Sequence, residues 1–274
     1  MHAKSFAKLN LFLHILSRNL NNYHQIQSYL LRISLFDEVK IESAVRYECK
    51  VIGADIENNI VDKVISLLKY CLNQDMLFRI TIKKNIPIAA GLGGGSSNAA
   101  VVLQLLLEHF KVSQSLRRNI YLKAQKIGAD LAFFLQNNNA FVEGIGNVVT
   151  PVLLQETFYL LLVNTGLKIS AKYAYSSCSE EDFLAKIVCN KKNIKNSIFF
   201  GKNGLERCMK QKYSELNNLL SIIKMQKNCL VSRMSGSGAT CFGLFNKLDD
   251  LNRARKELAS ILPCSWIYSE RVLL

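Results

Sequence analysis

Hydrophobic and polar side chains alternate at the start of the chain. Leu9, Leu11, Leu13 and Ile15 lie two residues apart and share one face of an extended segment, which predicts a strand over residues 3–16. Similar patterns predict a strand pair within 27–41, strands at 77–82 and near 140–143, an amphipathic helix over 58–73, a buried helix that begins near 96–98, and a helix over 113–127.

The pattern changes near Pro151. Beyond this residue it predicts strands at 157–163, 229–234, 239–245 and 265–272, Lys-rich helices between 170 and 226, and a helix at 248–261. No internal repeat or low-complexity segment is present. We expect two domains, residues 1–150 and 151–274, because 274 residues are enough for one large domain or two modest ones.

Composition narrows the class of protein. The chain is 49% hydrophobic and 20% charged with 3 Pro, which is typical of a globular protein and excludes a disordered or collagen-like one. The eight cysteines form no Cys-x-x-Cys pair and the four histidines have no zinc-ligand spacing, so we expect reduced thiols in a cytoplasmic protein. No run of about 18 apolar residues occurs, and no membrane-spanning helix is expected.

The chain is strongly basic. Its 35 Lys and Arg against 21 Asp and Glu give a formal charge of +14, which nucleic acid, a membrane surface or a polyanionic small molecule could explain. The basic residues occur in short pairs such as Lys83-Lys84, Arg117-Arg118 and Lys191-Lys192. Phosphate backbones are bound by clustered charge, so a dedicated nucleic-acid arm is not expected.

Residues 85–98 form a glycine-dense loop that leads from a strand into the buried helix. Gly91 and the run 93–95 permit positive φ and remove side-chain bulk, so successive amides can surround an anion. The amino end of the helix adds unpaired N–H groups, and Ser96 and Ser97 add hydroxyls. These features together predict a polyphosphate site, and the alternative is a flexible hairpin with a serine N-cap.

Two better-known phosphate motifs do not fit this loop. No Gly-Lys-Ser/Thr follows the glycines, so the loop is not a Walker A sequence. It also lacks the acidic residue after a second strand that marks a dinucleotide-binding fold.

Phosphoryl transfer also needs a group that orients the attacking hydroxyl and a cation that stabilises charge. Asp130 lies between small and aromatic residues, and Lys8 lies on a strand that is otherwise apolar. The alternatives are an N-cap for Asp130 and a surface lysine with a buried stem for Lys8. Their occurrence together with the glycine loop favours a catalytic pair.

Three motifs resemble, in the same order, those of the GHMP kinases, the family of galactokinase, homoserine kinase and mevalonate kinase. They are Ala7-Lys8-Leu9-Asn10-Leu11-Phe12-Leu13 followed by Tyr23-His24, then Pro87 through Gly91-Leu92-Gly93-Gly94-Gly95-Ser96-Ser97-Asn98 to Ala100, and Arg233-Met234-Ser235-Gly236-Ser237-Gly238 through Phe242. The resemblance spans nearly the whole chain.

The resemblance implies an α+β protein with the two-domain GHMP kinase fold. Its N-terminal α/β domain would carry a left-handed βαβ crossover, an exception to the usual hand, and its C-terminal domain would be ferredoxin-like. It also implies ATP and Mg²⁺, and phosphoryl transfer to an alcohol. The triple glycine and the Lys-Leu-Asn-Leu opening favour members whose substrate is a cytidine diphosphate-linked polyol. We expect no nucleic-acid or membrane partner, and a monomer or weak homodimer.

The motif positions also imply site residues. Lys8 and Asp130 would be catalytic. The ATP-binding residues would be Asn58, Pro87, Gly91, Leu92, Gly93, Gly94, Gly95, Ser96, Ser97 and Asn98. The substrate-binding residues would be Asn10, Tyr23, His24, Lys84, Ser235, Gly236, Ser237 and Gly238. Ser96 and Ser97 each offer a hydroxyl that could contact Mg²⁺, and Ser97 is our candidate.

Some positions depart from the family pattern. Leu131-Ala132 follows the aspartate where a proline is common, Ala89-Ala90 replaces glycines, Ala171 replaces a threonine, and Gly204 replaces an acidic residue. Two other functions stay open: a kinase of the same fold that acts on homoserine, mevalonate or another small alcohol, and a nucleotide-binding or nucleic-acid-binding regulator without catalysis.

Overall fold

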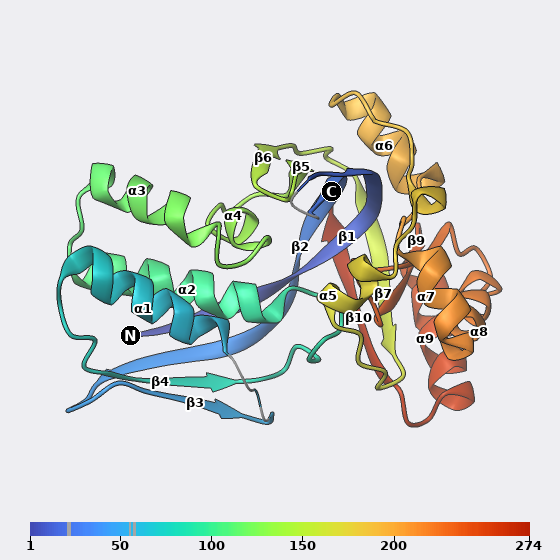
Figure 1. Ribbon diagram of the computed structural model, residues 1–274. Coiled ribbons are helices and arrows are strands. Elements are labelled where there is room, and N and C mark those ends of the chain that lie inside the picture. The colour runs from blue at the N-terminus through green and yellow to red at the C-terminus, as the bar shows by residue number, and fades with distance from the viewer. Residues whose placement is uncertain (21–22, 55, 57–58) are drawn as a thin grey trace.

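The structure is a computed structural model that describes residues 1–20, 23–54, 56 and 59–274. The described chain forms two β-sheets that lie side by side, each with helices packed against it (Figure 1). No helix within these ranges is both long enough and apolar enough to span a bilayer.

The first sheet contains the strands of the N-terminal half. They are β1 (His2–Arg18), β2 (His24–Ser43), β3 (Glu48–Ile52), β4 (Phe78–Lys83), β5 (Ala140–Gly144) and β6 (Val148–Pro151). Their order is β3-β4-β2-β5-β6, and β1 pairs with β2. Among these described strands, β3 and β4 form the parallel pair, and the chain between them contains a helix.

Helices cover one side of this sheet (Figure 1). They are α1 (Ile60–Leu72), α2 (Gly94–His109), α3 (Gln114–Ala124) and the short α4 (Leu131–Phe134). Helix α2 is apolar nearly all round because it packs between the sheet and the other helices. Its amino end therefore has a fixed position, which matters for the site described below.

The second sheet contains β7 (Thr157–Asn164), β8 (Val231–Met234), β9 (Cys241–Phe245) and β10 (Trp266–Leu273). These strands are antiparallel in the order β10-β7-β9-β8, and helices follow β7 and β9. This topology is the expected ferredoxin-like arrangement. The helices are α5 (Ala171–Ser176), α6 (Lys191–Phe200), α7 (Glu206–Lys212), α8 (Ser214–Lys224) and α9 (Leu248–Ile261).

The first strand belongs to the cores of both halves. Leu9 and Leu11 of β1 are fully buried in one cluster with Leu160 of β7 and Phe242 of β9. The two sheets therefore share hydrophobic contacts instead of meeting only at their edges. The chain leaves the first sheet at Pro151 and enters the second at Thr157; the domain division at residue 150 stays a prediction.

The alternating pattern predicted most elements and missed a few. The helix at 248–261 and the strands on either side of it are confirmed. The expected strand pair within 27–41 is wrong, because the segment is one continuous strand, β2, paired along its length with β1. The short elements β3, β6 and α4 were not predicted. The left hand of the crossover formed by β3, α1 and β4 stays a prediction.

Candidate active site

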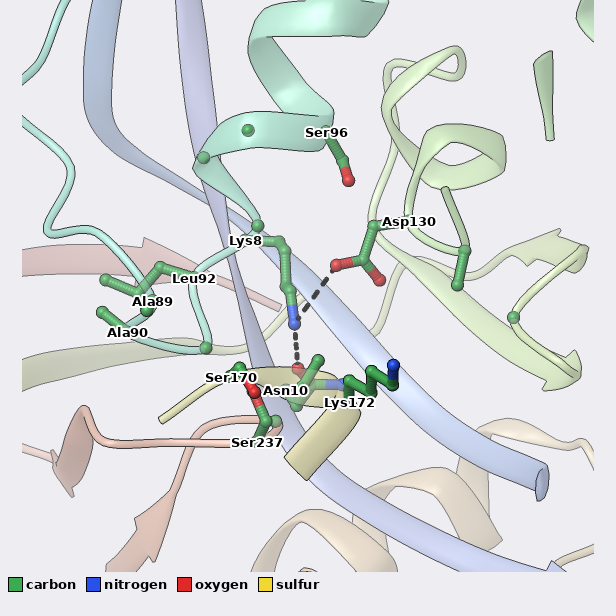
Figure 2. A pocket seen from close by; sticks show the side chains of 18 of the residues that line it. Lys8, Asn10, Ala89, Ala90, Leu92, Ser96, Asp130, Ser170, Lys172 and Ser237 are labelled. Carbon is green, nitrogen blue, oxygen red and sulfur yellow. Dashed lines mark hydrogen bonds and ion pairs between the residues drawn. The ribbon is translucent and has the colours of Figure 1, made fainter. Parts of the chain in front are cut away.

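A cavity of about 810 Å³ lies between the two halves of the molecule. Its walls come from β1, β2 and β4, from the loop between β4 and α2, from the turn before α4, and from α5 and the β8–β9 loop (Figure 2). Segments far apart in the sequence thus meet in one space.

Lys8 and Asp130 face each other in this cavity. Lys8 Nζ lies 3.6 Å from Asp130 Oδ2, as the dashed line in Figure 2 shows. The Lys8 side chain is 6% exposed and that of Asp130 is 33% exposed. Asp130 occupies the N-cap position of α4 but makes no capping hydrogen bond. The two structural alternatives, an N-cap role for Asp130 and a surface position for Lys8, therefore do not fit, because Asp130 does not cap the helix and Lys8 is buried.

A short network fixes the position of Lys8. Its backbone N–H donates to Leu92 O at 3.0 Å, which joins β1 to the glycine loop. Its ammonium donates to Asn10 Oδ1, and the Asn10 amide donates to Ser28 Oγ at 2.8 Å. A Cβ at Gly93 would lie 2.9 Å from Lys8 Cγ, so only glycine lets the loop pass this close.

The amino end of α2 opens into the cavity. Gly93, with φ 70°, is the N-cap, and no side chain caps this end. Gly94, Gly95 and Ser96 line the wall, and as the first helical residues they have no intrahelical acceptor for their N–H groups. Unpaired amides and the positive end of the helix dipole together suit a phosphate group.

The two serines of the motif lie on different sides of the helix. Ser96 lines the cavity, and in Figure 2 its hydroxyl points toward the side of Asp130. Ser97 is 1% exposed, and its hydroxyl donates to Phe6 O at 2.6 Å. This hydroxyl also accepts from Ser5 at 2.8 Å. The expected Mg²⁺ contact of Ser97 therefore does not fit, because its hydroxyl is buried and already paired within the fold.

The Ser-Gly-Ser-Gly loop closes the cavity from the second half. Gly236 and Ser237 line it, whereas the Ser235 hydroxyl is buried and donates to Gly91 O at 3.1 Å. Gly91 has φ 74°, and a Cβ there would lie 2.1 Å from Ser235 O. Ser235 thus joins the two glycine-rich loops, Gly238 donates to Ser235 O at 2.9 Å within its own loop, and neither residue lines the cavity.

Lys84 lies beside the glycine loop and pairs with a buried carboxylate. Its ammonium forms an ion pair with the fully buried Asp37 and a 3.3 Å hydrogen bond to Asn98 Oδ1. A Cβ at Gly94 would lie 3.0 Å from Lys84 Nζ. Asp37 is far along β2 from His24, so the structure places Lys84 away from Tyr23 and His24.

Aromatic side chains line the opposite end of the cavity. Tyr23 is exposed, and the buried His24 ring lies 5.3 Å from that of Tyr175. Burial, together with the positive charge of Arg18, lowers the pKa of His24. Pro87 also lines the cavity. Asn58 lies outside the described residues.

Several residues at the cavity were not predicted. Tyr175, Arg18 and Lys172 line it, and Asn203 donates to Met234 O and Gly236 O at 2.8 and 2.7 Å, which holds the second loop in place. Tyr175 and Lys172 belong to α5, a short helix with no recognisable motif. No local signal marks them, because their role depends on where α5 packs.

Two departures from the family pattern have structural explanations. Leu131 and Ala132 are buried and belong to the helical turn α4 immediately after Asp130. A Cβ at Gly204 would lie 3.0 Å from both Ile15 and the Asp182 carbonyl, so a larger residue would not fit here without movement.

Comparison with known proteins agrees with this arrangement. Residues 59–138 match the family described as GHMP kinases N terminal domain, and residues 187–264 match GHMP kinases C terminal. The protein belongs to the GHMP kinase family. The first matched range contains the glycine loop and Asp130, and the second contains the Ser-Gly-Ser-Gly loop.

Two relatives that align over nearly the whole chain have the same name. The 4-diphosphocytidyl-2-C-methyl-D-erythritol kinase of Ehrlichia ruminantium (strain Gardel) is 31% identical over 98% of both chains. The protein of that name from Clostridium botulinum (strain Hall) is 34% identical over 93% of both. A crystal structure of 4-(cytidine 5'-diphospho)-2C-methyl-D-erythritol kinase aligns with a TM-score of 0.80, 27% identity and 98% coverage of both. The mevalonate kinase of L. major, at 13% identity and a TM-score of 0.70, shares the fold.

Proposed function

We propose that this protein transfers the γ-phosphoryl group of ATP to the 2-hydroxyl of 4-diphosphocytidyl-2-C-methyl-D-erythritol, a step of the non-mevalonate isoprenoid pathway. The observation that carries the proposal is the Lys8–Asp130 pair, 3.6 Å apart, in the same cavity as the uncapped amino end of α2. The full-length relatives of that name support this acceptor over homoserine or mevalonate.

The chemistry assigns a separate task to each wall of the cavity. The amides of Gly94, Gly95 and Ser96 bind the ATP phosphates. Asp130 accepts the hydrogen bond of the acceptor hydroxyl and aims its oxygen at the γ-phosphorus. A new O–P bond forms, the bond from the γ-phosphorus to the β,γ-bridging oxygen breaks, ADP leaves, and the hydroxyl proton passes to Asp130. Lys8 stabilises the negative charge that develops on the reacting oxygens.

Magnesium fits this site as a phosphate-bound ion. No group of three His, Cys, Asp or Glu side chains in the described ranges could hold a metal by itself. Mg²⁺ commonly takes one or two protein oxygens and completes its shell with phosphates and water. The Ser96 hydroxyl and the Asp130 carboxylate are the oxygens available here, and the ion would neutralise phosphate charge.

The aromatic end of the cavity suits the cytidine group. The rings of Tyr23 and Tyr175 both line it and offer faces on which a pyrimidine can stack, and the His24 ring lies 5.3 Å from that of Tyr175. The acceptor would span the cavity, with its base near Tyr23 and its polyol near Asp130.

The test is release of ADP from ATP with and without the cytidine diphosphate-linked polyol. We expect turnover that depends on this acceptor, and much less with homoserine or mevalonate at equal concentration. Equal turnover with another alcohol would point to a related kinase. Micromolar binding of DNA or RNA that weakens with salt, without kinase activity, would point to the regulator instead.

The remaining expectations belong to the same proposal. The enzyme would act in the cytoplasm as a monomer or weak homodimer, with small molecules and no nucleic acid as partners. Its charge of +14 is consistent with a cavity that receives two polyphosphate ligands together.

A further inference from the structure

More positive than negative side chains line the cavity, and some of the positive ones have no carboxylate partner. Lys8, Arg18, Lys84 and Lys172 line it, whereas Asp130 is the one carboxylate among its described lining residues. Lys8 is paired with Asp130, and Lys84 with Asp37. Within the described ranges, neither Arg18 nor Lys172 has a carboxylate within ion-pair distance. The cavity therefore holds positive charge that the protein itself does not neutralise.

Lys172 stands on a firmly anchored element. Ser170 caps α5, and its hydroxyl accepts from the Tyr173 N–H at 3.1 Å. The preceding residue, Ile169, donates its N–H to Ala89 O at 3.2 Å, which ties this segment to the glycine loop. In Figure 2, Lys172 lies on the other side of the Lys8–Asp130 pair from Ser96. Its ammonium thus faces the acceptor half of the cavity and not the amino end of α2.

Tyr175 connects Lys172 to the aromatic end. The two residues are three positions apart, so they share one face of α5. The Tyr175 ring lies 5.3 Å from that of His24, and the charge of Asp130 adds to burial in raising the Tyr175 pKa. One face of α5 therefore lies close to both the catalytic pair and the aromatic end.

We propose that Lys172 binds the diphosphate of the phosphoryl acceptor and so positions the polyol hydroxyl at Asp130. This inference rests on the proposed function. An acceptor with its base near Tyr23 and its polyol near Asp130 must place its diphosphate between these two points. An ammonium at that place can make charge-assisted hydrogen bonds to phosphate oxygens.

Calorimetric binding of cytidine and of cytidine diphosphate to the full-length protein tests this inference. Lys172→Met removes the charge and keeps the side-chain length. We expect it to weaken cytidine diphosphate binding about 10-fold and to leave cytidine binding unchanged, since one charged hydrogen bond is lost. Lys172→Arg should restore most of the affinity. Lys168→Met is the matched control, because Lys168 is exposed on the same segment and does not line the cavity.

The outcomes separate this inference from the function on which it rests. If wild-type protein binds no cytidine diphosphate, the proposed function fails and this assignment fails with it. If wild-type binding is normal and Lys172→Met leaves it unchanged, only the role of Lys172 is rejected. Equal weakening of cytidine, or weakening of ADP in place of cytidine diphosphate, would also overturn it. Unchanged thermal unfolding of the variant shows that any effect is local.

Discussion

Two buried lysines in this protein each face one aspartate, and the two pairs differ in what surrounds the carboxylate. Lys8 and Lys84 are both 6% exposed at the side chain. Asp37, the partner of Lys84, is 0% exposed, whereas Asp130, the partner of Lys8, is 33% exposed and faces the cavity. The two Lys–Asp pairs thus differ in solvent access: one carboxylate is fully buried and the other faces the cavity.

The hydrogen bonds explain the difference. Asp37 accepts from the backbone N–H groups of Asn85 and Ile86 at 2.8 and 2.9 Å, and from the Asn98 amide at 3.0 Å. Its acceptor capacity is used within the protein, which pins the β4–α2 loop to β2. Asp130 has no capping hydrogen bond and keeps free acceptor capacity toward the cavity. A carboxylate whose acceptor capacity is used within the protein stabilises the fold, whereas a carboxylate with free acceptor capacity can bind a substrate.

The sharpest test of this comparison is Asp130→Asn. We expect turnover to fall by ~10²–10⁴, because the hydroxyl loses its charged acceptor. The free energy of unfolding should fall only modestly, because the Asp130 carboxylate is 33% exposed and Lys8 keeps its hydrogen bond to Asn10. Steady-state rates and urea denaturation measure the two quantities. Wild-type turnover in this variant would remove Asp130 from the mechanism.

Asp37→Asn should show the reverse pattern. Removing the charge leaves the ammonium of Lys84 buried without a counter-charge, and the expected loss of stability is ~3–5 kcal/mol. Turnover per folded molecule should stay much closer to wild type than in Asp130→Asn. Urea denaturation gives the first value, and rates normalised to the folded fraction give the second. If Asp37→Asn abolished turnover without destabilising the fold, the division between the two pairs would be lost.

Ser96 and Ser97 repeat the comparison on a smaller scale. Ser96→Ala should raise KM for MgATP about 3–10-fold with little change in stability, because it loses one hydroxyl in the cavity. Ser97→Ala should cost ~1–3 kcal/mol of stability and leave KM nearly unchanged, because Phe6 O loses its donor. Rates at varied MgATP and urea denaturation separate them; an exchange of the two phenotypes would mean that α2 is rotated.

The smallest expected effect concerns two buried histidines. The Nε2 atoms of His14 and His24 are buried without a hydrogen-bond partner. Burial lowers the pKa of both imidazoles below the usual 6.5, and the charges of Arg233 and Arg18 add to this. The unfolded chain then binds more protons, so stability should fall as pH decreases through and below about 6.5.

Denaturation at about pH 7.5 and about pH 5.5 measures this loss. His14→Phe should reduce the difference between the two pH values, whatever its effect on stability at neutral pH. A pH dependence identical to that of wild type would show that His14 does not contribute.

Much of the molecule follows from local sequence. The period of two in β1 and the apolar faces of α1 and α2 determine secondary structure, because side-chain direction repeats every few residues. The glycine run before α2 predicts an anion site for the same local reason: it combines positive φ with an uncapped helix end. Lys8 and Asp130 could be singled out because each is an isolated charge in an apolar segment.

The sequence by itself determined most of the elements, the phosphate loop and the two charged residues near it. Only the tertiary structure decided that Lys8 faces an open carboxylate while Lys84 faces a closed one, that Ser97 is buried behind Ser96, and that Lys172 and Tyr175 reach the cavity. The reason is physical. Hydrophobic periodicity is a property of neighbouring residues, but the partner and solvent access of a polar group depend on segments brought together from distant parts of the chain.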